Sequence, residues 1–142
     1  MKNDKFKSDN WLMGLVIIIG IVFLYISVLM HLYIAYLLLF KWKTTLAQKL
    51  FKYPGEKVDD AEPMAKIVAL YSISYSILAV VASTFYFRGK GRFSLPWVVC
   101  ALTPKCVVAL AVFAAHPTNW INATLFLTPP FVALLCLLLT YK

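Results

Sequence analysis

Charged residues are scarce in this chain of 142 residues: only 14% are Asp, Glu, Lys or Arg, whereas 62% are hydrophobic. A soluble domain carries about 25% charged and about 45–50% apolar residues. The difference excludes a soluble globular enzyme, a disordered tail and an ordinary nucleic-acid-binding module. The net charge of +8 does not indicate a nucleic-acid partner, because most basic residues lie at the ends of apolar runs. The composition predicts a small polytopic membrane protein.

Acidic residues are absent from the C-terminal part of the chain, because all six lie at or before Glu62. No apolar run therefore contains a carboxylate, the group that a proton-coupled exporter of organic cations needs in mid-membrane. This absence excludes cation/proton antiport and leaves an anion-binding site admissible. The chain also lacks P-loop, GxSxG, HExxH and paired-carboxylate motifs. We therefore do not expect an enzyme.

Cysteine is also rare. The three cysteines, Cys100, Cys106 and Cys136, form no CxxC pair and lie within apolar runs. Free cysteines in such positions act as small hydrophobic side chains, so no redox or metal-binding role is expected. The acidic cluster before Pro63 does not have the spacing of a calcium-binding loop. The sequence accordingly predicts no cofactor and no metal.

Four apolar runs take up most of the chain: residues 11–40, 64–87, 95–115 and 120–141. A helix of about 20 apolar residues crosses the hydrocarbon core of a bilayer. The predicted fold is therefore all-α, a single domain (1–142) of four transmembrane helices with a loop at 41–63. The first run is too long for a signal peptide. As a helix it would extend about 45 Å, so it must tilt, kink or project from the membrane.

The loop 41–63 begins with a basic amphipathic stretch. Its apolar side chains recur at helical spacing and lysines fill other positions: Trp42, Leu46, Leu50 and Tyr53, then Lys41, Lys43, Lys49 and Lys52. A short linker helix of this kind suits an anionic lipid surface. A surface turn that continues the first helix is the alternative. Carboxylates then precede Pro63, where they would complement the N-terminus of the second helix.

Small residues recur every three or four positions along the second run: Ala65, Ala69, Ser72, Ser76, Ala79 and Ser83. This spacing places all six on one face of a helix, which we call the small-residue seam. In lipid, helices associate through close packing of small residues. The seam predicts that this helix lies at the centre of the bundle or forms a dimer face. The first run is bulkier and is expected to face lipid over much of its surface.

The tripeptide Leu-Thr-Pro occurs near the middle of both the third and the fourth run, at Thr103–Pro104 and at Thr128–Pro129. Each proline removes a backbone N–H and frees the carbonyl four residues earlier. Many transporters build their substrate sites from paired interrupted helices near mid-membrane. The pattern therefore predicts ligand-binding roles for these four residues. Local capping by the two threonines, or coincidence in a biased composition, are the alternatives.

Lys105 lies about midway along the third run. A charged side chain at this depth costs roughly 2.5–3.5 kcal/mol on insertion scales, and no carboxylate of the chain lies in a membrane run. Its candidate partners are freed carbonyls, tyrosines, an acidic residue of a partner subunit, or an anionic ligand or lipid; deprotonation is the remaining alternative. We predict that Lys105 binds a ligand. His31, within the first run, is a candidate for a proton or polar contact.

These features favour a role in transport or handling of an anionic small molecule or lipid. The alternative is a non-catalytic binding subunit, either an accessory chain of a larger membrane complex or an immunity-type protein against a membrane-active toxin. The expected partners are membrane lipids and a second copy or a partner membrane subunit; the expected location is the bacterial inner (plasma) membrane. Basic residues divide seven to six between the two sides, so they set no orientation and admit an antiparallel dimer with both orientations.

Overall fold

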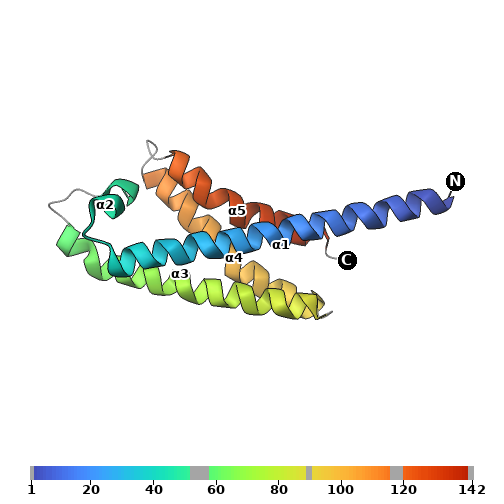
Figure 1. Cartoon of the computed structure of the whole chain (residues 1–142), viewed down its shortest axis with the longest axis horizontal. Helices are drawn as coiled ribbons and strands as arrows, with labels where there is room; N and C mark the ends of the chain where they lie inside the picture. Colours follow the sequence, from blue (N-terminus) through green and yellow to red (C-terminus); the bar gives the residue numbers. More distant parts are fainter. Residues whose placement is uncertain (1, 52–57, 89–90, 116–119, 141–142) are drawn as a thin grey trace.

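The computed structural model describes residues 2–51, 58–88, 91–115 and 120–140, which form five helices and no strand (Figure 1). In chain order the helices are α1 (Lys2–Phe40), α2 (Thr45–Phe51), α3 (Val58–Phe87), α4 (Gly91–Ala115) and α5 (Trp120–Leu139). The prediction of an all-α fold is confirmed for this part of the chain.

Three helices contain stretches that are long and apolar enough to cross a membrane: Trp11–Phe40 of α1, Asp59–Tyr86 of α3 and Trp120–Leu139 of α5. The corresponding apolar stretch of α4, Ser94–Leu110, is shorter. Helices of this length and composition are typical of membrane proteins, because a helix satisfies its own backbone hydrogen bonds in lipid. The structure thus has three or four candidate spans, where the sequence predicts four.

The four long helices form a bundle in which consecutive long helices run antiparallel (Figure 1). α1 packs against α3 and α5, and α4 packs against the same two helices. The four helices are therefore a ring of neighbours, and α3 is one member of this ring rather than its centre. The N-terminal part of α1 extends beyond the other helices (Figure 1), so the overlong first run projects from the bundle. Trp11, near the N-terminal end of α1, is 67% exposed.

Two apolar clusters fill the interior. The larger, which we call the four-helix cluster, takes side chains from all four long helices: Leu24, Val28, Ala79, Ala82, Leu95, Val98, Ala101, Leu102, Ala133 and Leu137. The second, the α1–α3 cluster, lies towards the loop and contains Ile34, Ala35, Leu38, Trp42, Ala65 and Ala69. Neither cluster takes a buried residue from positions 29–33 of α1 or 70–78 of α3. Two buried polar side chains, His31 and Ser76, lie in this interval.

The linker contains the short helix α2, preceded by a turn. The Thr44 hydroxyl accepts a hydrogen bond from the Ala47 N–H at 3.5 Å, the position of an N-terminal cap. Trp42 and Ala47 are buried, whereas Leu46 is 56% exposed. The apolar residues predicted to share one face are thus divided between the protein interior and the outer surface. Tyr53, the last of them, lies outside the described residues.

Ion pairs attach this linker to the start of α3. Lys43 Nζ lies 2.7 Å from Asp59 Oδ1 and 3.2 Å from Glu62 Oε2, and Glu62 also pairs with Lys66 at 2.8 Å. Hydrogen bonds to Asp59 and then to Glu62 hold the pKa of Lys43 above its ordinary value. Because Lys43 is well exposed, these pairs orient the linker more than they stabilise the fold.

α3 begins at Val58. The sequence analysis placed the start of this helix at Pro63, five residues later. Pro63 lies inside the helix and removes only one early hydrogen bond, the one that the Asp59 carbonyl would accept. Asp59 and Asp60 occupy the first turn, where carboxylates complement the free N–H groups of a helix N-terminus. Asp59 and Asp60, which were predicted to precede the helix, are therefore part of its first turn.

Gly20 marks a close approach of α1 to α5, and its replacement is expected to destabilise the bundle. A Cβ added at Gly20 would lie 2.9 Å from Cys136 Cβ and 3.3 Å from Leu137 Cγ. Gly20→Ala therefore forces the helices apart, at the cost of about 1–3 kcal/mol that overpacking brings. Thermal unfolding in detergent, followed by circular dichroism, measures the loss.

Gly14→Ala is the matched control on the same helix, because a Cβ at Gly14 meets no atom within 4 Å. Both variants gain the same helix propensity. Equal unfolding temperatures for the two variants would show that the close approach at Gly20 is absent.

Candidate functional site

Lys105 is buried in the middle of the bundle, with 4% of its surface exposed. Its Nζ donates a hydrogen bond of 3.2 Å to the hydroxyl of Ser76, on α3. His31, on α1, is 8% exposed, and its Nδ1 is 2.8 Å from the backbone carbonyl of Ser27. Ser27 is fully buried as well. We call Ser27, His31, Ser76 and Lys105 the polar layer: His31, Ser76 and Lys105 lie between the two apolar clusters, and Ser27 lies at the edge of the four-helix cluster, next to Val28.

The sequence of α4 directs Lys105 inward. The buried residues of this helix are single positions or adjacent pairs that recur once per turn: Ser94, Leu95, Val98, Ala101, Leu102, Lys105, Cys106 and Ala109. Val107 lies on the opposite side of the helix and is 57% exposed. A rotation that turned Lys105 outward would also remove Leu102 and Ala109 from the interior. The packing of the whole helix therefore holds the lysine inside.

The polar layer has hydrogen-bonding capacity that the protein does not use. An ammonium has three N–H donors, and within the described ranges Lys105 makes one hydrogen bond and no ion pair. A backbone carbonyl only accepts, so Nδ1 of His31 donates to Ser27, and Nε2 is an acceptor in the neutral ring. The Ser27 hydroxyl has no partner among the described residues. Buried polar groups are usually paired, so this concentration of unused capacity indicates a functional site.

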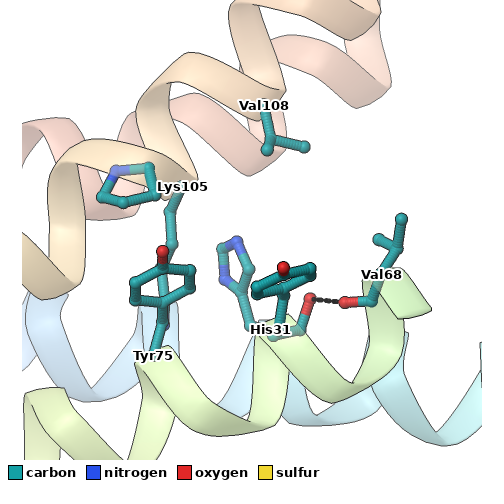
Figure 2. Close-up of a pocket in the computed structure, with 8 residues that line it drawn as sticks. His31, Val68, Tyr75, Lys105 and Val108 are labelled. Carbon is teal, nitrogen blue, oxygen red and sulfur yellow. Dashed lines mark hydrogen bonds between the residues drawn. The ribbon is translucent and has the colours of Figure 1, made fainter. Parts of the chain in front are cut away.

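A pocket of about 240 Å³ lies beside the polar layer, between α3 and α4 (Figure 2). It is lined by Val68, Tyr71, Ser72 and Tyr75 of α3, by Pro104, Lys105 and Val108 of α4, and by His31 of α1. Figure 2 shows His31 between the two helices, with Lys105 and Val108 extending from α4. Val68, Tyr71 and Val108 are 37%, 60% and 53% exposed, so the pocket opens on the outer face of the bundle.

The lining combines one cation with apolar and hydroxyl-bearing side chains. Asp59 and Asp60 lie in the first turn of α3 and Glu62 pairs with Lys43 and Lys66, and no carboxylate is among the residues that line this pocket. A single ammonium in apolar surroundings attracts an anion more strongly than it would in water. In the described part of the chain no group of three metal-ligating side chains comes together. The one cation of the lining, with no carboxylate beside it, makes the pocket chemically suited to an anion.

The structure brings three of the predicted residues to one place. Lys105, Pro104 and His31 all line the pocket. Thr103 is adjacent to them in sequence, but it is exposed and outside the lining. A rotation of about 100° per residue along a helix separates neighbouring side chains in this way.

The two predicted residues of α5 are not at the pocket. Pro129 is buried in the bundle, whereas Thr128 is exposed. The Thr128 hydroxyl donates to the Thr124 carbonyl at 2.8 Å. It therefore does not bond to the carbonyls of Leu125 and Phe126, which the prolines of α5 free.

The small-residue seam is mostly buried. It contributes residues both to the candidate site and to the packing of the helices. Ser72 lines the pocket and Ser76 accepts the hydrogen bond of Lys105. Ala79 belongs to the four-helix cluster. The Ser83 hydroxyl lies 3.3 Å from the hydroxyl of Tyr25 and so links α3 to α1. The seam thus places the polar layer as well as bringing the helices close together.

Tyr71 and Tyr75 line the pocket and were not singled out by the sequence analysis. Their rings are nearly parallel, at an interplanar angle of 20° with centroids 6.4 Å apart. A signal was available, since each tyrosine directly precedes a serine of the seam, Ser72 or Ser76, at a spacing of four residues. The position of the two tyrosines next to serines of the small-residue seam was therefore an available indication that they line the pocket.

Comparison with known proteins gives a family match without a function. The family model described as "Protein of unknown function (DUF1304)" matches residues 25–138. No curated protein and no solved structure matches the chain. The matched range contains every residue of the polar layer and of the pocket lining.

Proposed function

The chain belongs to the DUF1304 family, and we propose that it is a membrane protein that binds and handles an anionic small molecule or lipid. The observation that supports this function is the placement of Lys105. It is 96% covered by its own chain, yet it lines a pocket that opens on the outer face of the bundle.

The cost of burying the lysine supports a ligand. A lysine at mid-membrane costs roughly 2.5–3.5 kcal/mol on insertion scales, and such residues are usually functional. One hydrogen bond to the neutral Ser76 hydroxyl offsets only part of that cost. An anion in the pocket would supply the missing countercharge. The ligand then stabilises the fold by binding only to the folded state.

The competing function is a binding subunit in which Lys105 pairs with an acidic residue of another protein. Because Lys105 is only 4% exposed, such a residue would have to enter through the pocket. A pocket of about 240 Å³ suits a small ligand group better than a helix of a partner. The burial of Lys105 therefore favours a ligand.

The broader setting follows from the same proposal. We place the protein in the bacterial inner membrane as a non-catalytic component of transport or lipid handling, with membrane lipids as partners. A homodimer is compatible with the ring of four helices, whose outer faces are largely apolar. Exposed apolar residues include Leu29 and Tyr33 of α1 and Leu70 of α3.

Native mass spectrometry tests this function on protein extracted in mild detergent from its own membrane. The wild-type protein is expected to retain a small anion or an acidic lipid, and Lys105→Met is expected to lose it. Lys66→Met is the matched control, because Lys66 is an exposed lysine of α3 that pairs with Glu62 outside the pocket. A stoichiometric complex with another membrane protein, without any bound anion, would instead establish the binding subunit.

A further inference from the structure

We propose that the ligand is a single-chain amphiphile with a carboxylate head, such as a fatty acid, which enters the pocket sideways from the bilayer. This inference rests on the proposed function and names its substrate class. Three observations carry it: the height of the opening, the charge of the lining and the size of the pocket.

The opening lies at the height of the acyl chains. Ser72, in the pocket lining, is at the middle of the apolar stretch Asp59–Tyr86. The four-helix cluster lies on one side of the polar layer and the α1–α3 cluster on the other. A water-soluble anion would have to cross half of the hydrocarbon core to reach Lys105, at a high desolvation cost. An amphiphile already has its chain at this depth.

The exposed rim of the pocket suits an acyl chain. Val68 of α3 and Val108 of α4 stand at the rim, on the two sides of the space between these helices (Figure 2). Figure 1 shows α4 leaning away from α3 as it runs from its N-terminus, so the two helices diverge along this side. A chain that leaves the pocket between the two valines continues directly into lipid.

The charge of the lining matches one carboxylate. Lys105 is the single cation among the lining residues, and the other polar groups are His31, Ser72 and two tyrosines. Phosphate sites usually have arginine forks or helix N-termini. The pocket has neither, since Lys105 lies mid-helix and no arginine lines the site. One ammonium neutralises one carboxylate and would leave a doubly charged phosphate partly uncompensated.

The size of the pocket is that of a head and the first part of a chain. Its volume of about 240 Å³ is below the roughly 300–1,000 Å³ of sites that enclose a drug-sized ligand. A two-chain phospholipid needs room for its glycerol and for both chains. The pocket therefore favours a single-chain amphiphile that is only partly enclosed.

Binding of palmitate to the full-length protein in nanodiscs of zwitterionic lipid tests the inference. Saturable binding of palmitate is expected, with hexadecanol, which has the same chain without the charge, weaker by about ten- to a hundredfold because a charged hydrogen bond is lost. Lys105→Met is expected to weaken palmitate by a similar factor. Equal binding of palmitate and hexadecanol would overturn the inference.

The side entrance has its own pair of variants. Val108→Phe places a ring in the opening and is expected to reduce palmitate binding about tenfold or more, whereas Val107→Phe is expected to leave it unchanged. Both valines are exposed and adjacent in sequence, but only Val108 lines the pocket. Val68→Phe blocks the opposite rim of the opening. It replaces Val108→Phe as the test of lateral entry if Val108→Phe does not fold. Equal effects at positions 107 and 108 would contradict lateral entry.

Two further probes separate this inference from the function on which it rests. Acetate and inorganic phosphate carry the anionic groups without a chain. Lys105-dependent binding of either probe, with no binding of palmitate, would overturn the amphiphile and retain the anion site. If neither palmitate nor the soluble anions bind, both proposals are wrong.

Discussion

Replacing Lys105 and Ser76 together, as Lys105→Met/Ser76→Ala, is expected to make the ligand-free protein more stable than the wild type by about 1–3 kcal/mol. The double variant removes both members of a buried hydrogen bond and so leaves no polar group of that pair without a partner. Methionine is unbranched and flexible enough to occupy the volume of the lysine stem. Thermal unfolding of ligand-free protein in detergent measures the gain.

The single variant Ser76→Ala is expected to act in the opposite direction. It leaves Lys105 buried without the Ser76 hydroxyl, and an unsatisfied buried polar group costs about 1–3 kcal/mol, more when it is charged. Opposite signs for the single and the double variant would show that the lysine is kept at the expense of stability, as expected for a binding residue. A double variant less stable than the wild type would instead identify the polar layer as a structural element.

The parts of the fold that the sequence predicted are those that depend on local composition. A run without charges, such as residues 11–40, forms a membrane-length helix whatever its neighbours are, because lipid leaves the backbone few alternatives. The inward position of Lys105 was predictable on the same grounds, since a lysine in the middle of a span cannot face acyl chains cheaply. The start of α3 was misplaced because Pro63 is tolerated in an early turn as well as at the first position.

Which residues line the pocket depends on how the helices are rotated and packed against one another. The sequence pattern along a single helix does not determine this. The sequence analysis treated Pro104 and Pro129 as interruptions of two helices, but α4 and α5 continue through them, and only Pro104 lines the pocket. Spacing along one helix fixes which residues share a face, whereas the rotation of that face towards a neighbour is set by packing. The two tyrosines of the lining were missed for the same reason, because they line the pocket only through the position of α4 across from α3.

The second large effect is expected from Ala79→Leu, which places a bulky side chain in the middle of the small-residue seam. Ala79 is fully buried in the four-helix cluster, in contact distance of residues from the neighbouring helices. Overpacking of a well-filled interior costs typically 1–3 kcal/mol, and in lipid it also removes the close helix contacts that drive association. A lower unfolding temperature in detergent is the expected result.

The same substitution is expected to weaken ligand binding, although Ala79 does not line the pocket. Ala79 is one turn from Ser76, so a displacement of α3 would draw the Ser76 hydroxyl away from Lys105. Val80→Leu is the matched control, because Val80 is the next residue and is 36% exposed. If Ala79→Leu and Val80→Leu unfold at the same temperature and bind palmitate equally well, the seam does not hold α3 in place. If only Ala79→Leu lowers both the unfolding temperature and the binding of palmitate, helix packing and the anion site are coupled through α3.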